Sequence, residues 1–575
     1  MDFKFKNQET FWHSSAHLMA HAVTLLWPDV KPTIGPTIET GFYYDFYKKE
    51  PFVPEDLAKI EEKMKELAEK NLNIVKKEMT IAQAKKLFKD NKFKIELIDE
   101  LKKEGAKKVT VYSQGDFADL CRGPHLTSTG EIRAFKLTKI SSAYWRGDAS
   151  NDSLQRIYGV SFPDKKQLRM YLQFLAEAEK RDHRKIGAKL GLFSFHEEAP
   201  GMPFYQDGGV FLFKTLVKFM RDELAKRNYV EAKTPIIMNK KLWLCSGHWD
   251  HYKENMYFTK IDEQENALKP MNCPGQILIY KEKLHSYKEF PIRMAEFGMV
   301  HRHELSGVLS GLFRVRMFTQ DDAHIYCLPS QLKDEIKALI SLADTVYKTF
   351  GFNYCIELGT RPEKSIGSNK MWDAAENALK DVLKELKLDC QLNPGDGAFY
   401  GPKIDFHIKD AIGRTWQCAT IQVDFSMPEK FDLVYMDEQG SQDKRPVMLH
   451  RTIFGSMERF IGILIEHYAG NFPLWLNPNQ VIVLPIADRH NKYAEEVRAK
   501  LLEAGLRVKV DGRIESTGKK IRDGQLNKFS YILVVGDNEV KAGTVNVRTR
   551  DNKVHGEQKV DDLIKNLLKE IEDKK

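Results

Sequence analysis

Hydrophobic and polar positions follow two different periods along the first 160 residues, so both helices and strands are expected there. Residues 9–27 repeat apolar side chains at helical spacing behind Thr10, a residue type that often caps helices. Residues 54–70 open with a proline and pair opposite charges four positions apart, as an exposed helix face does. Residues 109–115 and 135–147 instead alternate apolar and polar side chains, which predicts strands. The chain therefore begins with a mixed α+β domain.

The middle of the chain contains more strand-like runs than short crossover helices. Residues 290–304, 313–327 and 413–425 carry strand patterns, whereas residues 329–350 repeat apolar positions at helical spacing. A long helix precedes them and leads into a strand that begins near Pro235. This alternation favours an α+β domain built around an antiparallel sheet.

The last hundred residues have a different pattern, in which short apolar runs alternate with helical segments. It predicts a small α/β unit with mixed or parallel strand pairing. We therefore divide the chain into an α+β domain (1–163), a charged helical linker (164–190), an antiparallel-sheet domain (191–477) and an α/β domain (478–575).

Composition agrees with a globular enzyme of several domains. At 575 residues the chain exceeds what one hydrophobic core supports, and 42% of its residues are hydrophobic and 30% charged. The net charge is +8, and half of this excess lies in residues 480–575, where it would suit either RNA or a solvated surface.

The cysteines and the N-terminus bear on the cellular compartment. Seven cysteines, an odd number without paired spacing, indicate a reducing environment. The N-terminus lacks a signal-like apolar region, and no stretch approaches the ~18 apolar residues of a membrane span. We expect a cytoplasmic protein that does not enter the membrane.

The most informative chemistry lies in the predicted hairpin around residue 308. Arg302 and Glu304 are two positions apart and would project from one face of a strand, and Arg314 returns on the following strand. Two arginines and a carboxylate on one face could grip a triphosphate and an adenine edge. Surface salt bridges would explain the same residues. Further on, Arg459 opens a helix behind a Gly-Ser turn, which is a weak signal by itself.

The combination of these elements is much more specific. Arg302, Glu304, Arg314 and Phe318, followed by GSMER at 455–459, resemble motifs 2 and 3 of class II aminoacyl-tRNA synthetases. Pro235 lies in a segment similar to motif 1, the dimer-forming element. Further stretches resemble threonyl-tRNA synthetases in particular: MNCPG, RMAEFG, TQDDAHI, AFYGPKID, WQCATIQVDF and LHRTIFGSMERF. The resemblance runs from about residue 8 to within about 15 residues of the end.

The resemblance implies a homodimeric enzyme with a class II catalytic core, which joins threonine to tRNA(Thr) at the expense of ATP and Mg²⁺. By it, Arg302 contacts the α-phosphate, Glu304 reads the adenine amino group and Arg459 holds the γ-phosphate. His248, in SGHWDHY, matches a histidine linked to transfer of threonine to the ribose. A hydrogen-bonded loop histidine is an equally good interpretation of it.

The resemblance also implies one Zn²⁺ per subunit on Cys273, His324 and His450, which no spacing rule would group. Three ligands leave a coordination position open for substrate. A metal that requires the threonine hydroxyl would exclude valine. Asp322 would take the hydroxyl proton, and Gln320, Tyr400 and Gln422 would line the pocket. The family usually reads MNCPGH, whereas this chain has Gln276 in place of the histidine.

A second constellation lies near the N-terminus. His13 and His17 share a helix face, and Cys121 and His125 repeat the four-residue spacing. A metal site and a set of hydrogen-bonded core histidines are both consistent with this pattern; protease chemistry of the HExxH type is not, because Ser14 occupies the glutamate position. These residues resemble the editing site that hydrolyses seryl-tRNA, to which Asp119 and Tyr43 are expected to contribute.

The resemblance also predicts features of the two ends of the chain. Residues 478–575 resemble an anticodon-binding domain, with Glu539 and Arg548 at positions that contact anticodon bases. The ubiquitin-like (TGS) domain usual at the front of bacterial members is absent, either naturally or because the sequence was shortened. We weighed three alternatives: an RNA-binding regulator without ligase activity, a stand-alone metallohydrolase, and a synthetase for serine or proline.

Overall fold

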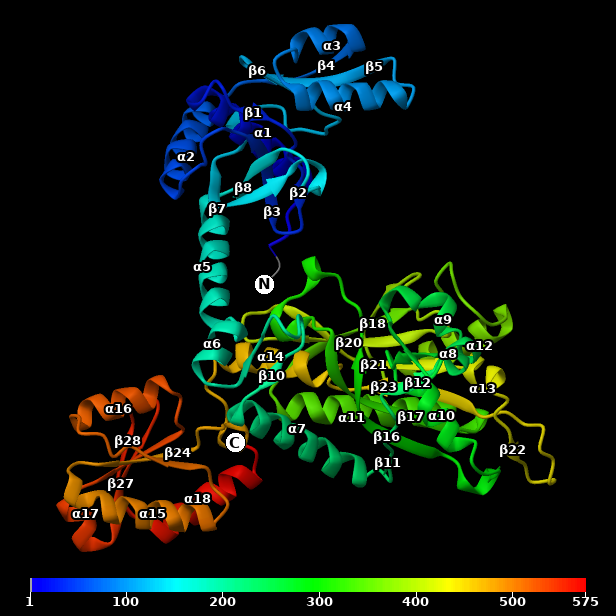
Figure 1. Ribbon diagram of the computed structural model, residues 1–575, viewed down its shortest axis with the longest axis vertical. Helices are drawn as coiled ribbons and strands as arrows, with labels where there is room; N and C mark the ends of the chain where they lie inside the picture. Colours follow the sequence, from blue (N-terminus) through cyan, green and yellow to red (C-terminus); the bar gives the residue numbers. More distant parts are fainter. Residues whose placement is uncertain (1–2) are drawn as a thin grey trace. The chain divides into compact units, whose positions relative to one another are not determined.

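The computed structural model describes residues 3–575, which form two compact units that meet between Glu177 and Ala178 in the sequence (Figure 1). All seven cysteines are free thiols. Among the described residues, no helix combines the length and apolar character that crossing a membrane requires.

The first unit packs helix α1 (Gln8–Leu26) and helix α2 (Pro54–Glu69) against a five-stranded sheet. The sheet has the order β1-β3-β8-β7, with β2 beside β3, and its strands span Lys31–Pro32 (β1), Thr37–Ile38 (β2), Gly41–Tyr47 (β3), Ala134–Tyr144 (β7) and Ser153–Phe162 (β8). A second sheet holds β4 (Ile74–Thr80), β5 (Lys108–Gln114) and β6 (Phe117–Leu120), with α3 (Ile81–Leu87) and α4 (Lys92–Lys103). The predicted helices and strands of this unit are confirmed.

One detail of the first helix was wrong. The helix does not start behind Thr10 but at Gln8, with Asn7 as the capping residue in a left-handed conformation. Thr10 lies inside the first turn, where its carbonyl accepts a hydrogen bond from the Ser14 hydroxyl at 2.8 Å.

The charged segment that follows is helical, as expected, but it is broken. Helix α5 spans Lys165–Arg181 and helix α6 spans His183–Lys189. The Asp182 carboxylate between them accepts the Arg184 backbone N–H at 2.8 Å and so caps α6.

The second unit is built on an eight-stranded sheet of order β11-β16-β17-β23-β21-β20-β18-β19. Its strands are antiparallel except for β11–β16 and β18–β19. They span Val230–Glu231 (β11), Ile292–His301 (β16), Met317–Cys327 (β17), Asn353–Gly359 (β18), Cys390–Asn393 (β19), Lys403–Lys409 (β20), Thr415–Asp424 (β21) and Val447–Thr452 (β23). The antiparallel α+β core predicted from the pattern is confirmed.

Four helices form the main hydrophobic core with this sheet: α7 (Asp207–Ala225), α11 (Leu332–Thr349), α12 (Asn369–Glu385) and α14 (Met457–Tyr468). On β17, Ala323 and Ile325 belong to this core, so Asp322 and His324 between them face the opposite side. Helix α10 (Cys273–Tyr280) supplies residues to a separate cluster with Tyr326 and Tyr400. One face of the sheet therefore packs into the main hydrophobic core, and the other carries polar side chains such as Asp322 and His324.

Smaller sheets lie beside this core. Strands β12 (Ile237–Asn239), β14 (Gln264–Leu268) and β13 (Tyr257–Ile261) form one; β9 (Phe193–Ser194) pairs with β10 (Phe204–Tyr205), and β15 (His285–Ser286) with β22 (Tyr435–Met436). Short helices α8 (Lys240–Ser246), α9 (His248–His251) and α13 (Ser426–Lys430) connect them.

The C-terminal part holds a mixed sheet of order β25-β24-β26-β27-β28, parallel at β25–β24–β26 and antiparallel beyond. Mixed pairing was one of the two arrangements expected. The elements are β24 (Val481–Pro485), α15 (Asn491–Glu503), β25 (Val508–Val510), α16 (Thr517–Leu526), β26 (Tyr531–Val535), α17 (Asp537–Ala542), β27 (Thr544–Thr549), β28 (Val554–Lys559) and α18 (Val560–Glu572). Strand β28 and helix α17 were not predicted.

The first turn of helix α7 packs closely against the main chain at Leu192. A Cβ added at Gly209 would lie 2.0 Å from the carbonyl oxygen of Leu192, which is fixed main chain. Gly518, in the first turn of α16, has nothing within 4 Å of the same position.

We expect Gly209→Ala to lower the midpoint of thermal unfolding, although alanine is favoured over glycine in helices by about 1 kcal/mol. The reason is the backbone clash, which no side-chain rotation can relieve. Gly518→Ala is the matched control and should leave the midpoint unchanged or slightly higher. Calorimetry of both variants would contradict the packing argument if Gly209→Ala were as stable as wild type.

Candidate functional site

A polar cavity of about 390 Å³ opens beside the face of the sheet that carries Asp322 and His324. Arg302, Arg314 and Arg459 line it together with Glu304 and Phe318. Arg314 Nε lies 3.0 Å from Glu304 Oε2, and the Arg302 guanidinium lies 5.0 Å from the Phe318 ring centroid. The cavity thus concentrates positive charge, which suits a polyphosphate.

The predicted strand geometry of these residues was wrong, although they do come together. Strand β16 ends at His301 and β17 begins at Met317, so Arg302, Glu304 and Arg314 lie in the loop between them rather than on the two strands. Arg302 still pairs its backbone N–H with the Arg316 carbonyl at 2.9 Å, while Glu304 N–H bonds to the Arg302 carbonyl. The turn, rather than strand periodicity, directs both side chains into the cavity.

Arg459 is fixed by three contacts at the start of α14. Its backbone N–H bonds to the Ser456 hydroxyl at 3.1 Å, so the Gly-Ser turn acts as the helix cap. Its side chain donates to the carbonyls of Phe313 and Gln417, each at 3.2 Å.

A second cavity, of about 350 Å³, adjoins the first and shares Arg302 and Gln320 with it. Its other predicted lining residues are Cys273, Asp322, His324, Tyr400, Gln422 and His450. His324 pairs directly with His450 across β17–β23, and His450 pairs with Gln422 across β23–β21. Three neighbouring strands therefore present these residues in one row.

The thiol and the two imidazoles of the second cavity converge. One donor atom each from Cys273, His324 and His450 lies within 4.8 Å of the others, and all three residues are buried. His450 Nε2 lies 2.9 Å from Asp424 Oδ2, and His324 Nδ1 lies 2.8 Å from Gln276 Oε1. Each ring thus has one nitrogen engaged by an oxygen, and Nδ1 of His450 and Nε2 of His324 remain for a ligand.

This donor set fits a zinc ion. Burial raises the pKa of Cys273 well above its usual value and lowers that of His324 well below, so burial favours the uncharged forms of these two side chains. Neutral imidazoles are ready ligands, and a divalent cation would stabilise the thiolate. Two nitrogens, one sulfur and an oxygen acceptor behind each imidazole are typical of zinc.

Asp322 faces the same cavity and is held by Asn272, whose side-chain amide donates to Asp322 Oδ2 at 2.9 Å. Burial raises the pKa of Asp322 to about 6. Tyr400 donates its hydroxyl to Gln422 Oε1. His248 lies behind this cavity, fully buried, with Nδ1 2.8 Å from the Ser246 hydroxyl and a pKa lowered to about 3 by burial.

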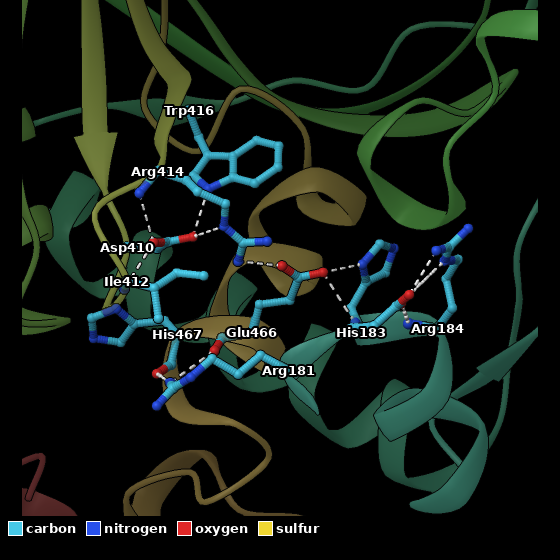
Figure 2. Close-up of polar contacts among 10 residues, drawn as sticks. Arg181, His183, Arg184, Asp410, Ile412, Arg414, Trp416, Glu466 and His467 are labelled. Atoms are coloured by element: carbon cyan, nitrogen blue, oxygen red, sulfur yellow. Dashed lines mark hydrogen bonds and ion pairs between the residues drawn. The ribbon is translucent and has the colours of Figure 1, made fainter. Parts of the chain in front are cut away.

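A polar network centred on His183 and Glu466 joins helices α6 and α14 (Figure 2). His183 Nδ1 lies 2.7 Å from Glu466 Oε1, and the Leu312 backbone N–H donates to His183 Nε2 at 2.9 Å. The other Glu466 oxygen pairs with Arg414, which also donates to Asp410 at 2.6 Å. Because these atoms already have partners, the cluster is a structural network rather than a metal site.

That network supports the cavity that is lined by the three arginines. The His183 ring lies 4.1 Å from the Phe313 ring, and Phe313 is the residue whose carbonyl holds Arg459. Sequence reasoning did not find it, because neither His183 nor Glu466 belongs to a recognised motif.

The predicted N-terminal residues also converge, within the first unit. Cys121 Sγ lies 3.2 Å from both His13 Nε2 and His125 Nε2, and His17 Nε2 lies 3.5 Å from Asp119 Oδ2. Burial raises the pKa of Cys121 to about 11 and lowers that of His17 well below its usual value. The cluster therefore consists of an uncharged thiol and neutral imidazoles.

Asp119 is anchored by two residues that the sequence did not reveal. Buried Lys94 forms an ion pair with it, and Tyr44 donates its hydroxyl to it. Tyr43 points to the other side of β3, where its ring contacts Arg156 and Tyr158. Lys94 lies in helix α4, for which the sequence analysis made no prediction.

Glu539 and Arg548 lie in the C-terminal sheet domain. Glu539 Oε2 accepts the Gly536 backbone N–H at 2.9 Å and so caps α17. Arg548 lies on β27 opposite Ile532, and its Nε is buried without a hydrogen-bond partner among the described residues.

Comparison with known families agrees with this architecture. Residues 257–468 match the family described as tRNA synthetase class II core domain (G, H, P, S and T), and residues 480–570 match the anticodon binding domain. Residues 109–158 match the threonyl and alanyl tRNA synthetase second additional domain.

Two relatives match nearly the whole of this chain at more than 50% identity. The threonine–tRNA ligase of Carboxydothermus hydrogenoformans is 56% identical over 99% of this chain and 90% of its own, and that of Finegoldia magna is 54% identical with the same coverage. Among solved structures, the RNA binding domain of threonyl-tRNA synthetase from Cryptosporidium parvum matches with TM-score 0.66 and 42% identity, over 68% of this chain and 98% of that one.

Two adjoining cavities on the antiparallel sheet, one lined by three arginines and the other by Cys273, His324 and His450, within a matched core domain, define a class II aminoacyl-tRNA synthetase. At 56% and 54% identity over nearly its full length, the chain belongs to the threonyl-tRNA synthetase family. The resemblance seen in the sequence is thereby confirmed, and a serine or proline enzyme is excluded.

We expect His183→Ala to lower the free energy of unfolding by about 1–3 kcal/mol, because it removes the ring that contacts Glu466 Oε1 and leaves the buried Leu312 N–H without its acceptor. Urea unfolding of the purified protein would measure this. His196→Ala, which removes an exposed histidine whose ring contacts the Ser194 hydroxyl and the edge of Phe204, is the control and should change stability by less than about 0.5 kcal/mol. Equal stability of the two variants would contradict a supporting role for the network.

Proposed function

We propose that this chain activates threonine with ATP, transfers it to the 3′ end of tRNA(Thr), and hydrolyses Ser-tRNA(Thr) formed in error. Residues 1–163 would edit, 164–190 would link, 191–477 would catalyse and 478–575 would bind the anticodon. The observation that carries the proposal is the position of Arg302, which lines both cavities of the catalytic sheet.

Arg302 is suited to the activation step. With ATP in the cavity of the three arginines and the amino acid in the adjoining one, the amino acid carboxylate would attack the α-phosphate near Arg302 and pyrophosphate would leave. A guanidinium held there stabilises the negative charge that develops at the phosphorus centre. Its fixed position lowers the barrier because little reorganisation is needed.

The remaining groups of this cavity would orient the nucleotide. Arg459 and Arg314 supply charge for the outer phosphates, and the Glu304 carboxylate accepts hydrogen bonds from the adenine amino group. Mg²⁺ bound with ATP would neutralise part of the phosphate charge.

Selectivity would arise in the second cavity. Cys273, His324 and His450 would hold one Zn²⁺, which when bound offers an open coordination position to the amino and hydroxyl groups of threonine. Asp322, oriented by Asn272, would accept the hydroxyl proton, and Gln320, Tyr400 and Gln422 would complete the walls. Valine lacks the hydroxyl and leaves these polar groups unpaired.

Rejection of serine requires a second site, because the loss of one methyl group changes the binding free energy by only about 1–3 kcal/mol. His13, His17, Cys121 and His125 would bind the terminal ribose and orient a water molecule against the ester. The Cys121 thiol is uncharged at neutral pH, so it would act through hydrogen bonds rather than as a nucleophile. Asp119 would hold His17. Tyr43, whose ring lies against Arg156 and Tyr158 on the opposite side of β3, would take no part in this site.

The other assignments concern partners. Glu539 and Arg548 would contact anticodon bases, and His248 would assist transfer to the ribose. The segment around Pro235 would form a homodimer, and the enzyme would work in the cytoplasm.

We expect Arg302→Ala to reduce threonine-dependent ATP–pyrophosphate exchange by about 10²–10³-fold, because a preorganised charge at the reacting phosphate is lost. Wild type should exchange with threonine and not with valine. Arg498→Ala, an exposed arginine in the C-terminal domain, is the control and should exchange normally. Near-normal exchange by Arg302→Ala would refute the placement of the α-phosphate.

We expect Cys121→Ala and His13→Ala to slow deacylation of Ser-tRNA by about 10²-fold, because the groups that orient water are removed. Threonine-dependent exchange should be kept, since it needs only the catalytic domain. Cys355→Ala, at an exposed cysteine of the catalytic sheet, serves as the control. Equal hydrolysis of Thr-tRNA and Ser-tRNA by wild type would rule out a sieve at this cluster.

A further inference from the structure

Gln276 is the residue at which this chain departs from the usual family motif, and it lies fully buried in helix α10. Its side chain bridges two groups. His324 Nδ1 lies 2.8 Å from its Oε1, and its Nε2 lies 3.2 Å from Glu296 Oε2. The departure therefore falls directly behind one member of the Cys-His-His cluster.

The surroundings of Glu296 decide which way the Gln276 amide points. The Glu296 carboxylate, 1% exposed, accepts hydrogen bonds from the Thr234 backbone N–H and hydroxyl and from the Lys269 ammonium at 2.8–3.1 Å. An ionised carboxylate can only accept, so Gln276 must present its NH₂ group to Glu296. Its carbonyl oxygen is then the atom that faces His324.

This orientation fixes the tautomer of His324. Since Gln276 Oε1 can only accept, His324 must carry its proton on Nδ1 and keep the lone pair of Nε2 free. That lone pair is the one available to the cluster with Cys273 and His450. The chain of contacts runs from Lys269 and Thr234 through Glu296 and Gln276 to His324, and every member is buried.

We infer that Gln276 is a positioning residue that holds the His324 ring in the tautomer and orientation needed to bind the metal. It does so with an amide in place of the imidazole that the family usually has at this position. The inference rests on the zinc site of the proposed function and adds to it the residue that orients one ligand. Outer-shell partners of this kind typically change metal affinity by about 10–100-fold when removed.

Three variants of the zinc-loaded enzyme test this inference. Gln276→Met keeps the length of the side chain but removes both hydrogen bonds, and Gln276→His restores the usual residue. Gln480→Met is the matched control, since Gln480 is also a buried glutamine that bridges a donor and an acceptor, the Arg507 N–H at 2.8 Å and the Leu474 carbonyl at 3.1 Å.

The readouts are zinc per subunit after dialysis, zinc affinity in competition with a chromophoric chelator, and the thermal midpoint. We expect Gln276→Met to bind zinc about 10–100-fold more weakly, while Gln276→His and Gln480→Met keep wild-type affinity even if Gln480→Met unfolds earlier. Wild-type zinc affinity in Gln276→Met would overturn the inference, as would an equal loss of affinity in Gln480→Met.

A measurement on the wild type covers the case in which Gln276→Met does not fold. Histidine-selective ¹⁵N NMR, assigned by the signals lost in His324→Asn, should show the His324 proton on Nδ1. A proton on Nε2 would overturn the inference. A wild-type enzyme without zinc would instead overturn the metal site of the proposed function, and the tautomer would still decide whether Gln276 orients His324.

Discussion

The pairing register of strands β17, β23 and β21 is the constraint on which the catalytic half depends. It places His324 opposite His450 and His450 opposite Gln422, so that three strands contribute to one row. Side chains alternate between the two faces of a strand, and a shift of one residue would turn all of these groups into the core. Ala323 and Ile325, which flank His324 on the core side, make such a shift unfavourable because it would expose them.

Buried polar networks fix the loops that the sheet cannot fix. Asp321, on the core side of β17, accepts hydrogen bonds from the Thr452 hydroxyl and from the backbone of Ile453 and Phe454, which holds the turn that leads to Arg459. Arg459 lies near the start of helix α14, and the contact between His183 and Glu466 holds the other end of this helix. Buried charges of this kind are costly unless every group is paired, so they define one arrangement of the site rather than adding much stability.

The two histidine clusters share donor types but differ in what surrounds them. In the catalytic cluster each imidazole has an oxygen acceptor behind it, which leaves one nitrogen of each ring free towards Cys273. In the N-terminal cluster the imidazoles contact the Cys121 sulfur and one another, and Asp119 is already neutralised by Lys94. The first arrangement is suited to a metal ion, and the second to hydrogen bonding of an uncharged group.

The sequence by itself determined the family and most of the helices and strands, although not β28 and α17, because periodicity and local motifs are properties of neighbouring residues. It missed Lys94 and Tyr44, which anchor Asp119, and the pair of His183 and Glu466. Tyr44 and Asp119 are 75 positions apart in the sequence, and His183 and Glu466 are 283 apart. It also placed Arg302 and Glu304 on a strand, whereas a turn directs them. Only the tertiary structure decided which nitrogen of His324 is free, since that depends on Gln276, Glu296 and Lys269 meeting in one buried place. Side-chain hydrogen bonds between distant segments leave no period in the sequence, and for that reason they had to be found in the folded chain.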